Sequence, residues 1–489
     1  MSPYLDNTRT YVRLFKIAQA PGFKKRHNIK IGIVIPPSPF VVPNGWEFVH
    51  RAPFEGPSVI SAVLRGLGLD VVILDQRENF DPEVLRGGPL KKLDIVSVAT
   101  YEDSFPFIKK VIEIAKQEER LRPVILGGPL VTSVPKLVMD NTSADYAVVG
   151  EGELTTIELM DFIMQLRGAL AVPEIKGLAW KDHAGQTILN PRRSQMHNLD
   201  AVPLQDLSVW PYVQQSGIVP EIYMSSSRGC PGRCTFCFRA IPLLRYKTPG
   251  RVRRELLYLK KYKYRFVWWN DLTFIDSRER IHKLMDDAFK GIDFRWSCFT
   301  RVDGLDLRVL KHMKEYGCDI VMYGFESINK EILDYFRKKV SKSQIIRAIQ
   351  LTRKTGLKMG GLFIIGGPGE TRESLQRTIE FCRKFKEVTR VKYMSAIPGT
   401  VLYYDAIKKG IIKDEVQHLN FLARERSVED DEIINFTDLS VKELRDAYRS
   451  INRQIEVRPY EYWDPVNHYL AKPQRFKDRH FVATSMNSA

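Results

Sequence analysis

Cysteine is scarce in this 489-residue sequence, and it is unevenly placed. There are six cysteines, none of them before Cys230. So few thiols at such uneven spacing exclude a disulfide framework, and they fit a reducing compartment in which thiols stay free to bind metals. The sequence therefore predicts a cytoplasmic location.

Long apolar runs are also missing. A membrane-spanning helix needs about 20 consecutive apolar residues, and the most apolar stretches, Ile31–Val42 and Leu357–Gly367, are interrupted by prolines or glycines. The N-terminal segment is basic but lacks the apolar core of a signal peptide. Tyr11–Ala18 has helical spacing, so we expect an amphipathic helix that packs on the first domain, with contact at a membrane surface as the alternative.

Acidic side chains are too few to balance the basic ones, and the formal net charge is +17. Part of the excess lies between Arg239 and Arg265, where lysines and arginines surround the single acid Glu255. Such a stretch fits nucleic acid, anionic lipid, or a phosphorylated or carboxylated substrate. A basic proteome would produce the same charge without any partner, so charge alone selects none.

Three of the six cysteines form one motif, C-x3-C-x2-C, at Cys230, Cys234 and Cys237. A cubane iron–sulfur cluster normally takes four thiolates, so three leave one iron open to a substrate or cofactor. A structural zinc site would need a fourth ligand, and the nearest histidines, His197 and His282, are not paired at ligand spacing; a distant fourth ligand stays open. The spacing favours a [4Fe-4S] cluster that does chemistry.

Strands and helices alternate over residues 29–165, which predicts a doubly wound parallel sheet of Rossmann-like type after an N-terminal extension at 1–28. Ligands of such sheets bind beyond the carboxyl ends of the strands. Glycines and polar residues stand at those ends, and glycine lets a ligand approach the backbone closely. The candidate binding residues at this edge are Thr100, Tyr101, Gly127, Gly128, Gly150, Glu151 and Gly152.

A second strand–helix series follows a linker at 166–215, which holds a small hairpin. Six βα units over residues 216–410 indicate a partial barrel, with its active site at the carboxyl ends of the strands. The expected strands are Glu221–Ser225, Arg265–Asn270, Asp293–Phe299, Asp319–Phe325, Lys358–Ile365 and Val391–Ala396. The three cysteines directly follow the first of these strands, so a cluster there would lie at the barrel mouth. Residues 411–489 have a mainly helical pattern and end in a polar tail, Phe476–Ala489.

Two further side-chain types on the barrel strands have open roles. Period-two alternation puts Cys298, together with Trp296 and Thr300, on the interior face of the barrel, although a buried cysteine most often only packs. Trp268 and Trp269, near the mouth, are expected either to line a substrate pocket or to pack in the core.

The cysteine motif, with the aromatic Phe236 before Cys237, resembles the CxxxCxΦC signature of radical S-adenosylmethionine (SAM) enzymes. That resemblance implies a partial (βα)6 barrel and a SAM molecule on the open iron. It also implies that reductive cleavage of SAM yields a 5′-deoxyadenosyl radical, with an external electron donor of flavodoxin or ferredoxin type. By the family pattern, SAM contacts are expected on successive strand ends, from Asn270, Asp271, Arg301, Glu326, Ser327, Gly366 and Gly367.

A Rossmann-like domain before such a barrel is similar to the cobalamin-binding subgroup of these enzymes. Gly127-Gly-Pro129 and Gly150-Glu-Gly-Glu153 resemble its phosphate and nucleotide-tail loops. The sequence departs from the subgroup at the D-x-H-x-x-G motif, because the loop Thr100–Phe105 contains no histidine. The resemblance then implies cobalamin held without a protein ligand to cobalt, or a domain that has lost cobalamin.

The leading hypothesis is a cobalamin-dependent radical SAM C-methyltransferase that acts on an unactivated carbon of a small-molecule or lipid-like substrate. The first alternative is a radical cyclase or rearrangement enzyme with the same cofactors. An RNA-modifying methylthiotransferase ranks low, because that family carries an additional N-terminal cysteine set. A cofactor sensor without catalysis is the remaining alternative.

Overall fold

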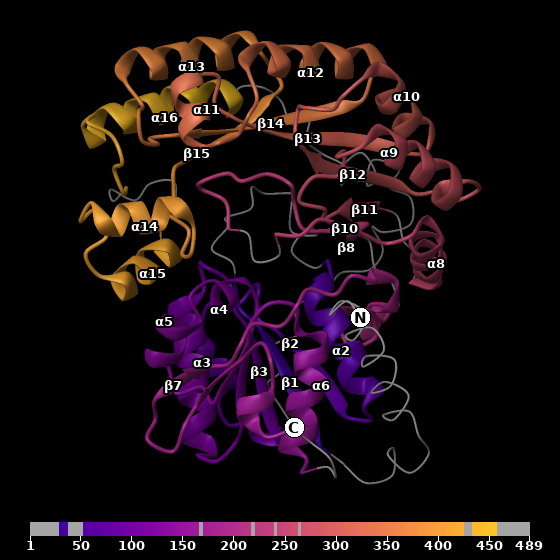
Figure 1. The fold of residues 1–489 in the computed structure, drawn as a ribbon, viewed down its shortest axis with the longest axis vertical. Helices are drawn as coiled ribbons and strands as arrows, with labels where there is room; N and C mark the ends of the chain where they lie inside the picture. Colours follow the sequence, from indigo (N-terminus) through magenta and orange to yellow (C-terminus); the bar gives the residue numbers. More distant parts are fainter. Residues whose placement is uncertain are drawn as a thin grey trace, which may run out of the picture.

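The computed structural model describes residues 29–37, 52–165, 170–216, 221–238, 242–262, 266–424 and 433–456. The expected helix at Tyr11–Ala18 and the tail Phe476–Ala489 lie outside the described residues. Two α/β units are stacked end to end, an N-terminal domain and a barrel, with C-terminal helices beside them (Figure 1). The expected α/β class and the order of its parts are confirmed.

The N-terminal domain is built on a seven-stranded sheet in the order β2-β1-β3-β4-β5-β6-β7, in which β1 to β5 are parallel. The hairpin expected between the two units is present as β6 and β7, and it extends this sheet in antiparallel pairing. The strands are β1 (Lys30–Ile35), β2 (Asp70–Asp75), β3 (Ile95–Ala99), β4 (Val124–Gly127), β5 (Tyr146–Val148), β6 (Leu178–Lys181) and β7 (Thr187–Leu189).

Helices cover both faces of this sheet, because successive strand residues point to opposite sides and both sides are apolar. Ile33 packs in the core beneath α2 (Glu55–Gly66) and α6 (Gly152–Ile163), whereas Val34 packs in the core beneath α3 (Phe105–Glu118). The short helices α4 (Pro129–Ser133), α5 (Pro135–Asp140) and α7 (Pro211–Ser216) complete the domain, with single 3-10 turns η2 (Pro82–Leu85), η3 (Leu90–Lys92), η4 (Val172–Glu174) and η5 (Leu199–Ala201).

The barrel is an open sheet of six parallel strands in the order β15-β14-β13-β12-β11-β8. Five strands lie close to their expected positions, and the last begins at Val388 rather than Val391. The strands are β8 (Glu221–Met224), β11 (Phe266–Trp269), β12 (Arg295–Thr300), β13 (Cys318–Glu326), β14 (Lys358–Ile365) and β15 (Val388–Tyr393). The helices are α8 (Pro249–Leu259), η6 (Lys260–Tyr262), α9 (Arg278–Leu284) with the π-turn η7 (Met285–Phe289), α10 (Leu307–Glu315), α11 (Lys330–Tyr335), α12 (Lys342–Thr355) and α13 (Arg372–Lys384).

The expected orientation of β12 is wrong. Trp296 and Cys298 pack in the core between the sheet and its helices, beside Trp269 and Leu310 of α10. The two faces of β12 therefore exchange roles relative to the expectation, because the bulky Trp296 fills the layer under the helices. Cys298 is a packing residue.

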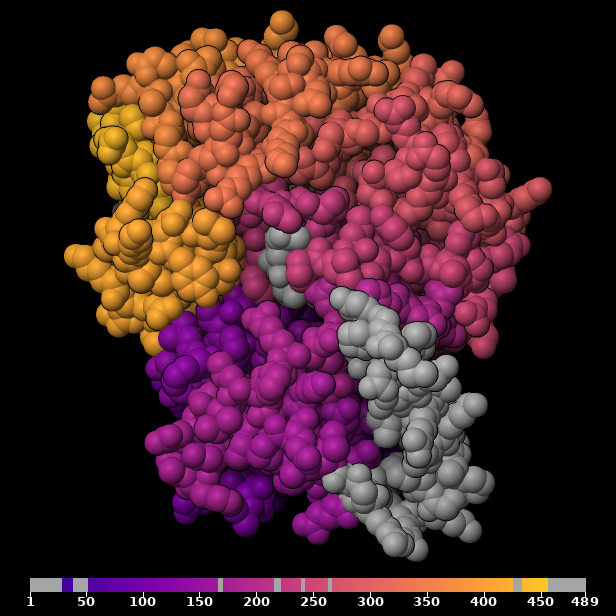
Figure 2. Space-filling model, in the orientation of Figure 1, coloured from indigo at the N-terminus to yellow at the C-terminus, as the bar shows by residue number. Residues whose placement is uncertain are grey.

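The C-terminal helices join the two units. In Figure 1, α14 (Val401–Lys408) and α15 (Glu415–Arg424) lie beside the N-terminal domain, and α15 packs on α3. The chain then returns to the barrel, where α16 (Val441–Glu456) packs on α13 and β15. In the space-filling view of Figure 2, the α14–α15 segment lies against both units on one side of the molecule.

Candidate active site between the two units

The cysteines lie in a loop whose two ends are paired. Two short strands, β9 (Ser227–Arg228) and β10 (Arg245–Tyr246), run antiparallel and close the base of the loop. Cys230 and Cys234 are half-buried and Cys237 is exposed. A Cβ atom added at Gly232 would lie 3.3 Å from the Cys230 Sγ and 3.9 Å from the Cys234 Sγ, so these two thiols converge on one space.

Cysteine thiols are the donors that hold iron–sulfur clusters. Among the described residues, no three Cys, His, Asp or Glu side chains are arranged to hold one metal ion. Although Cys237 is exposed as a residue, protein atoms around its Sγ desolvate the thiol; this, followed by the negative charges of Cys234 and Cys230, raises its pKa to about 11. Burial also raises the pKa of Cys234. The metal-free thiols of Cys234 and Cys237 are therefore protonated near neutral pH, and iron must displace those protons when it binds.

Two cations lie beside the thiols. Arg301, directly after β12, places its Nη1 3.5 Å from the same Cβ position at Gly232, and its Nε contacts Asp303 at 2.7 Å. Lys338 is buried, and its Nζ donates to the Glu326 Oε1 at 2.9 Å. The positive charges of Lys338 and Arg301 act to lower the pKa of Cys234 against burial. Both cations favour thiolate and would attract an anionic cofactor group.

The backbone around Lys338 is strained. Within the described part of the chain, four non-glycine residues have positive φ, and three of them are Glu326 (62°), Arg337 (50°) and Lys339 (56°). The pairing between β13 and β14 also shifts register next to Glu326. Strain of this kind persists only where the surroundings impose it, and it gathers at functional sites.

Of the other residues expected to contact SAM, Asn270 is free to face solvent, whereas Asp271 and Ser327 form hydrogen bonds within the protein. Asn270 is exposed at the end of β11. The Asp271 carboxylate instead accepts hydrogen bonds from the Ser226 backbone, at 3.0 Å, and from both serine hydroxyls before the cysteines, and so it fixes the chain that enters the loop. The Ser327 Oγ accepts from the Asn329 backbone at 3.1 Å.

Aromatic and glycine positions around the loop pack against the barrel. Phe236 meets the ring of Phe336 edge-on at 4.9 Å, so it anchors the cysteine loop to α11. A Cβ atom at Gly367 would lie 3.0 Å from the same ring, and one at Gly366 would lie 3.7 Å from Leu444. Direct contacts of these residues with SAM stay a prediction.

The edge of the N-terminal sheet has open space where a cofactor is expected. An added Cβ atom at Gly127 or Gly150 would meet nothing within 4 Å. Gly128 has a φ of 122°, and a Cβ atom there would lie 2.6 Å from the Thr100 carbonyl oxygen, so the turn requires glycine. The Thr100 Oγ1 donates to the Gly127 carbonyl at 3.1 Å and thereby ties β3 to β4. These features fit a flat cofactor that lies over the edge.

Tyr101 points from this edge toward the barrel. Its ring contacts Phe54 at 5.9 Å, and Phe54 contacts Tyr223 of β8 at 6.1 Å, which makes an aromatic bridge between the two units. Burial raises the pKa of Tyr101.

A cavity of about 250 Å³ connects the sheet edge with the cysteine loop. Its lining is mostly apolar, and it comes from three parts of the chain: the ends of β3 and β4, the cysteine loop, and the segment after β15. The lining residues are Glu102, Pro129, Leu130, Ser133, Phe236, Cys237, Phe238, Ile397 and Pro398. One predicted cluster ligand, Cys237, therefore faces the same space as Glu102 and Pro129, which directly follow residues of the predicted cofactor edge.

Known protein families match the two units in the same order. The sequence model of the B12 binding domain matches residues 55–160, and that of the radical SAM superfamily matches residues 224–382. The uncharacterized methyltransferase PH0819 of Pyrococcus horikoshii is 30% identical over 404 residues, which cover 78% of this chain and 84% of that protein. The chain belongs to the cobalamin-binding radical SAM enzymes. Such enzymes use a [4Fe-4S] cluster, SAM and cobalamin, and they need a reductant.

Solved structures of this family share the fold. The cobalamin-dependent SAM radical enzyme OxsB, with aqua-cobalamin and SAM bound, aligns with a TM-score of 0.62 at 16% identity. The match covers 81% of this chain but only 56% of OxsB. The radical SAM methyltransferase TsrM from Kitasatospora setae, with cobalamin and a [4Fe-4S] cluster bound, aligns with a TM-score of 0.62 at 16% identity over 78% of each chain.

The sequence reasoning missed several residues of the site. Lys338 stands next to Lys339 in an ordinary basic run, and only their burial separates them. Ile397 and Pro398, after β15, line the same cavity as Pro129 and Leu130, a proximity that no local pattern in the sequence indicates. In the part of the chain that the structure describes, no helix is long and apolar enough to cross a membrane.

Proposed function

We propose that this protein is a cobalamin-dependent radical SAM C-methyltransferase that acts on an unactivated carbon. The observation that carries the proposal is the cavity shared by Cys237 and the edge of the B12-binding sheet. A carbon placed there can be reached from both sides, which is the geometry that combined hydrogen abstraction and methyl delivery requires.

The side chains of the site divide the work. When bound, the cluster with SAM supplies a 5′-deoxyadenosyl radical, and cobalamin supplies a methyl group. Cys230, Cys234 and Cys237 would hold the cluster, and the ammonium of Lys338 and the guanidinium of Arg301 would balance its negative charge. Gly127 and Gly150 would leave room for cobalamin. The apolar cavity lining would favour the carbon skeleton of a substrate over water.

The cavity lining also bears on the substrate and the partners. Apolar walls favour a small-molecule or lipid-like substrate over a highly charged one. A reductant of flavodoxin or ferredoxin type would supply the electron, in the cytoplasm, where free cysteines persist.

Anaerobic reconstitution with iron, sulfide and cobalamin tests the proposal. With SAM carrying a deuterated methyl group and a strong reductant, we expect S-adenosylhomocysteine and 5′-deoxyadenosine together, and labelled methyl in a compound of a cell extract. If 5′-deoxyadenosine forms without S-adenosylhomocysteine, the methyltransferase proposal is wrong and a cyclase or rearrangement takes its place. If neither product forms, the protein is a sensor.

A further inference from the structure

The two strands that close the cysteine loop carry opposed arginines. Arg228 of β9 is directly paired with Arg245 of β10 in the antiparallel register. Like charges directly opposite each other on neighbouring strands repel. Both side chains are also withdrawn from water, with 15% and 4% of their surface exposed. This strand pair therefore needs anions in contact with both guanidinium groups.

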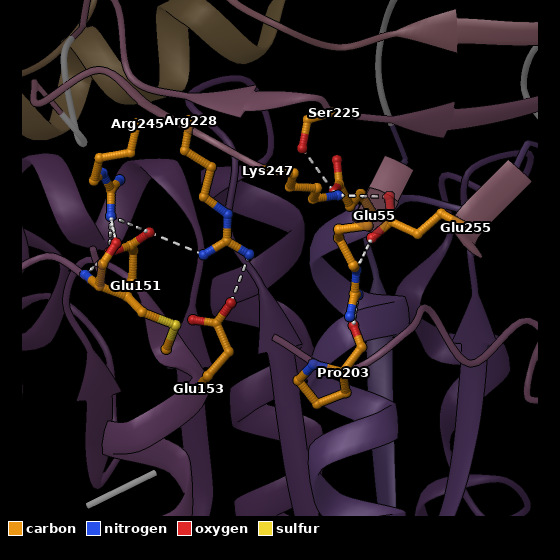
Figure 3. Close-up of polar contacts among 11 residues, drawn as sticks. Glu55, Glu151, Glu153, Pro203, Ser225, Arg228, Arg245, Lys247 and Glu255 are labelled. Carbon is orange, nitrogen blue, oxygen red and sulfur yellow. Dashed lines mark hydrogen bonds and ion pairs between the residues drawn. The ribbon is translucent and has the colours of Figure 1, made fainter. Parts of the chain in front are cut away.

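The anions come from the other unit. The Glu151 carboxylate bridges the two arginines, with one oxygen 2.9 Å from the Arg228 Nη1 and the other 2.9 Å from the Arg245 Nη1 (Figure 3). Glu153 contacts the Arg228 Nη2 at 2.6 Å. Both glutamates stand at the N-terminal end of α6, where the helix dipole favours negative charge. Burial opposes the charge of Arg228, but Glu153 and Glu151 more than offset it and raise its pKa.

A third carboxylate grips both flanks of the same loop. Glu55, the first residue of α2, accepts a hydrogen bond from the Ser225 Oγ at 2.7 Å, just before the loop, and contacts the Lys247 Nζ at 3.3 Å, just after it. Lys247 also contacts Glu255 of α8 at 2.9 Å, within the barrel (Figure 3). Helices α2 and α6 of the N-terminal domain thus hold both ends of the segment that carries the cysteines.

At the base of the loop the two backbone segments are in direct contact, so a displacement of one would move the other. Gly229, directly before Cys230, has a φ of 91°, and a Cβ atom there would lie 2.1 Å from the Leu243 carbonyl oxygen. The two sides of the loop therefore touch through their backbones. A shift of Arg228 or Arg245 would move Cys230 with it.

We propose that Glu151 and Glu153 are positioning residues, which fix the cysteine loop against the cobalamin-binding domain through Arg228 and Arg245. The cluster and the sheet edge would then be held at a set distance across the cavity. Buried ion pairs are poor sources of net stability but can specify one arrangement over others. The proposal rests on the proposed function only for the identity of the two cofactors so aligned.

Matched variants of the full chain test this role. The double variant Glu151→Gln, Glu153→Gln removes the two carboxylate charges that contact Arg228 and Arg245. Glu158→Gln is the control, because Glu158 lies on the same helix but pairs with Arg193, in the linker before the barrel. After reconstitution, we expect iron release to a chelator to be about 10-fold faster in the double variant, as for lost outer-sphere partners of other metal sites. We also expect the SAM-induced change in the EPR spectrum of the reduced cluster to differ from that of the control. Bound cobalamin should be unchanged in the control.

A second variant separates positioning from folding. Glu153→Gln with Arg228→Gln removes one whole ion pair and leaves no unpaired buried charge at that pair, so the variant should fold, and we still expect faster iron release and an altered EPR spectrum. Iron release and spectra equal to those of Glu158→Gln would overturn the positioning role. No substrate enters these measurements, so a wild type without methyl transfer would refute the proposed function and leave this comparison intact.

Discussion

At the scale of single residues, Lys338 is the clearest product of the fold. Its ammonium is buried between a carboxylate and the cysteine loop, on a backbone that two left-handed neighbours force into place. A lysine is rarely buried without a partner, and Glu326 is that partner at 2.9 Å. The ammonium of Lys338 is thereby fixed beside Cys234, where solvent screens its charge little.

Lys338→Met should therefore destabilise the protein, because it leaves the Glu326 carboxylate buried and unpaired. We expect a loss of about 3–5 kcal/mol in the free energy of unfolding, measured with urea. Adding Glu326→Gln should recover most of the loss, since no unpaired charge then remains. A double variant as unstable as the single one would contradict this reading of the pair.

Glu221 predicts a pH dependence of stability. Burial raises its pKa to about 7, against a hydrogen bond from the Trp268 Nε1 at 3.0 Å. Because the folded state binds this proton more tightly than the unfolded state, stability is greatest below about pH 4.5 for this group and falls as pH rises toward 7. Glu221→Gln should remove roughly 3 kcal/mol of that fall, at 1.36 kcal/mol per pKa unit. Urea titrations at several pH values give the free energy of unfolding as a function of pH. The same dependence on pH in the variant and the wild type would refute this role of Glu221.

Alanine variants of the cysteines test the cluster ligands. Cys230→Ala, Cys234→Ala and Cys237→Ala should each lose most of the bound iron, because a cubane with two protein thiolates is poorly held. Cys298→Ala should keep its iron, since Cys298 packs in the core. Iron retained in all three loop variants would disprove the ligand assignment.

Local sequence was enough to find the cysteines but not their surroundings. Cys230, Cys234 and Cys237 are recognised from their spacing alone, because all three lie within eight positions. The contact of Arg228 with Glu151 joins residues 77 positions apart, and nothing near either residue indicates it. Asp271 was placed correctly at a strand end, yet its two serine partners show that it shapes the loop, which position alone could not reveal.

At the scale of elements, periodicity predicted most strands and failed where two patterns compete. The expected last strand followed the apolar run Val391–Ala396, whereas β15 covers Val388–Tyr393, in which only Val388 and Val391 are buried. Because β15 is an edge strand of the sheet, it does not need the continuous apolar run of a strand buried on both faces. The short helices α4 and α5 were missed because each begins at a proline that also marks a turn.

The β9–β10 strand pair supplies an element-scale prediction. Gly229→Ala should disrupt the base of the cysteine loop, because the new methyl group would overlap the Leu243 carbonyl. We expect iron content to fall severely. Gly410→Ala is the control: its φ of 68° carries a strain of about 1–3 kcal/mol, but an added Cβ atom meets nothing within 4 Å, so iron should be retained. Similar iron content in both variants would show that the contact at Gly229 is unimportant.

At the scale of the whole molecule, part of the basic stretch that suggested nucleic acid is internal, although Arg254, Lys260 and Lys261 are exposed. Arg245, Lys247 and Arg251 are buried and engaged by carboxylates or carbonyl groups. The positive charges of these three residues form contacts inside the protein and do not face solvent. Composition could not reveal this, because it counts charges without locating them.

Shared burial between the units also predicts how the protein unfolds. Since the ion pairs and the α15–α3 contact cross the boundary, we expect the wild type to unfold in one transition, with far-UV circular dichroism and tryptophan fluorescence coincident. Glu55→Gln should lower the midpoint, because Lys247 and Ser225 lose a partner. Two separate transitions in the wild type would mean that the units are energetically independent.

The return of the chain to its own beginning has a consequence for biosynthesis. The N-terminal domain leaves the ribosome first. The helix α15, which covers α3, is made much later, because it ends at Arg424. Until those residues are made, the apolar surface of α3 lies bare and the glutamates of α2 and α6 face water, which they tolerate as charged groups at helix N-termini. The nascent N-terminal domain thus presents a hydrated, negatively charged surface, to which Arg228 and Arg245 bind once the barrel has been synthesised.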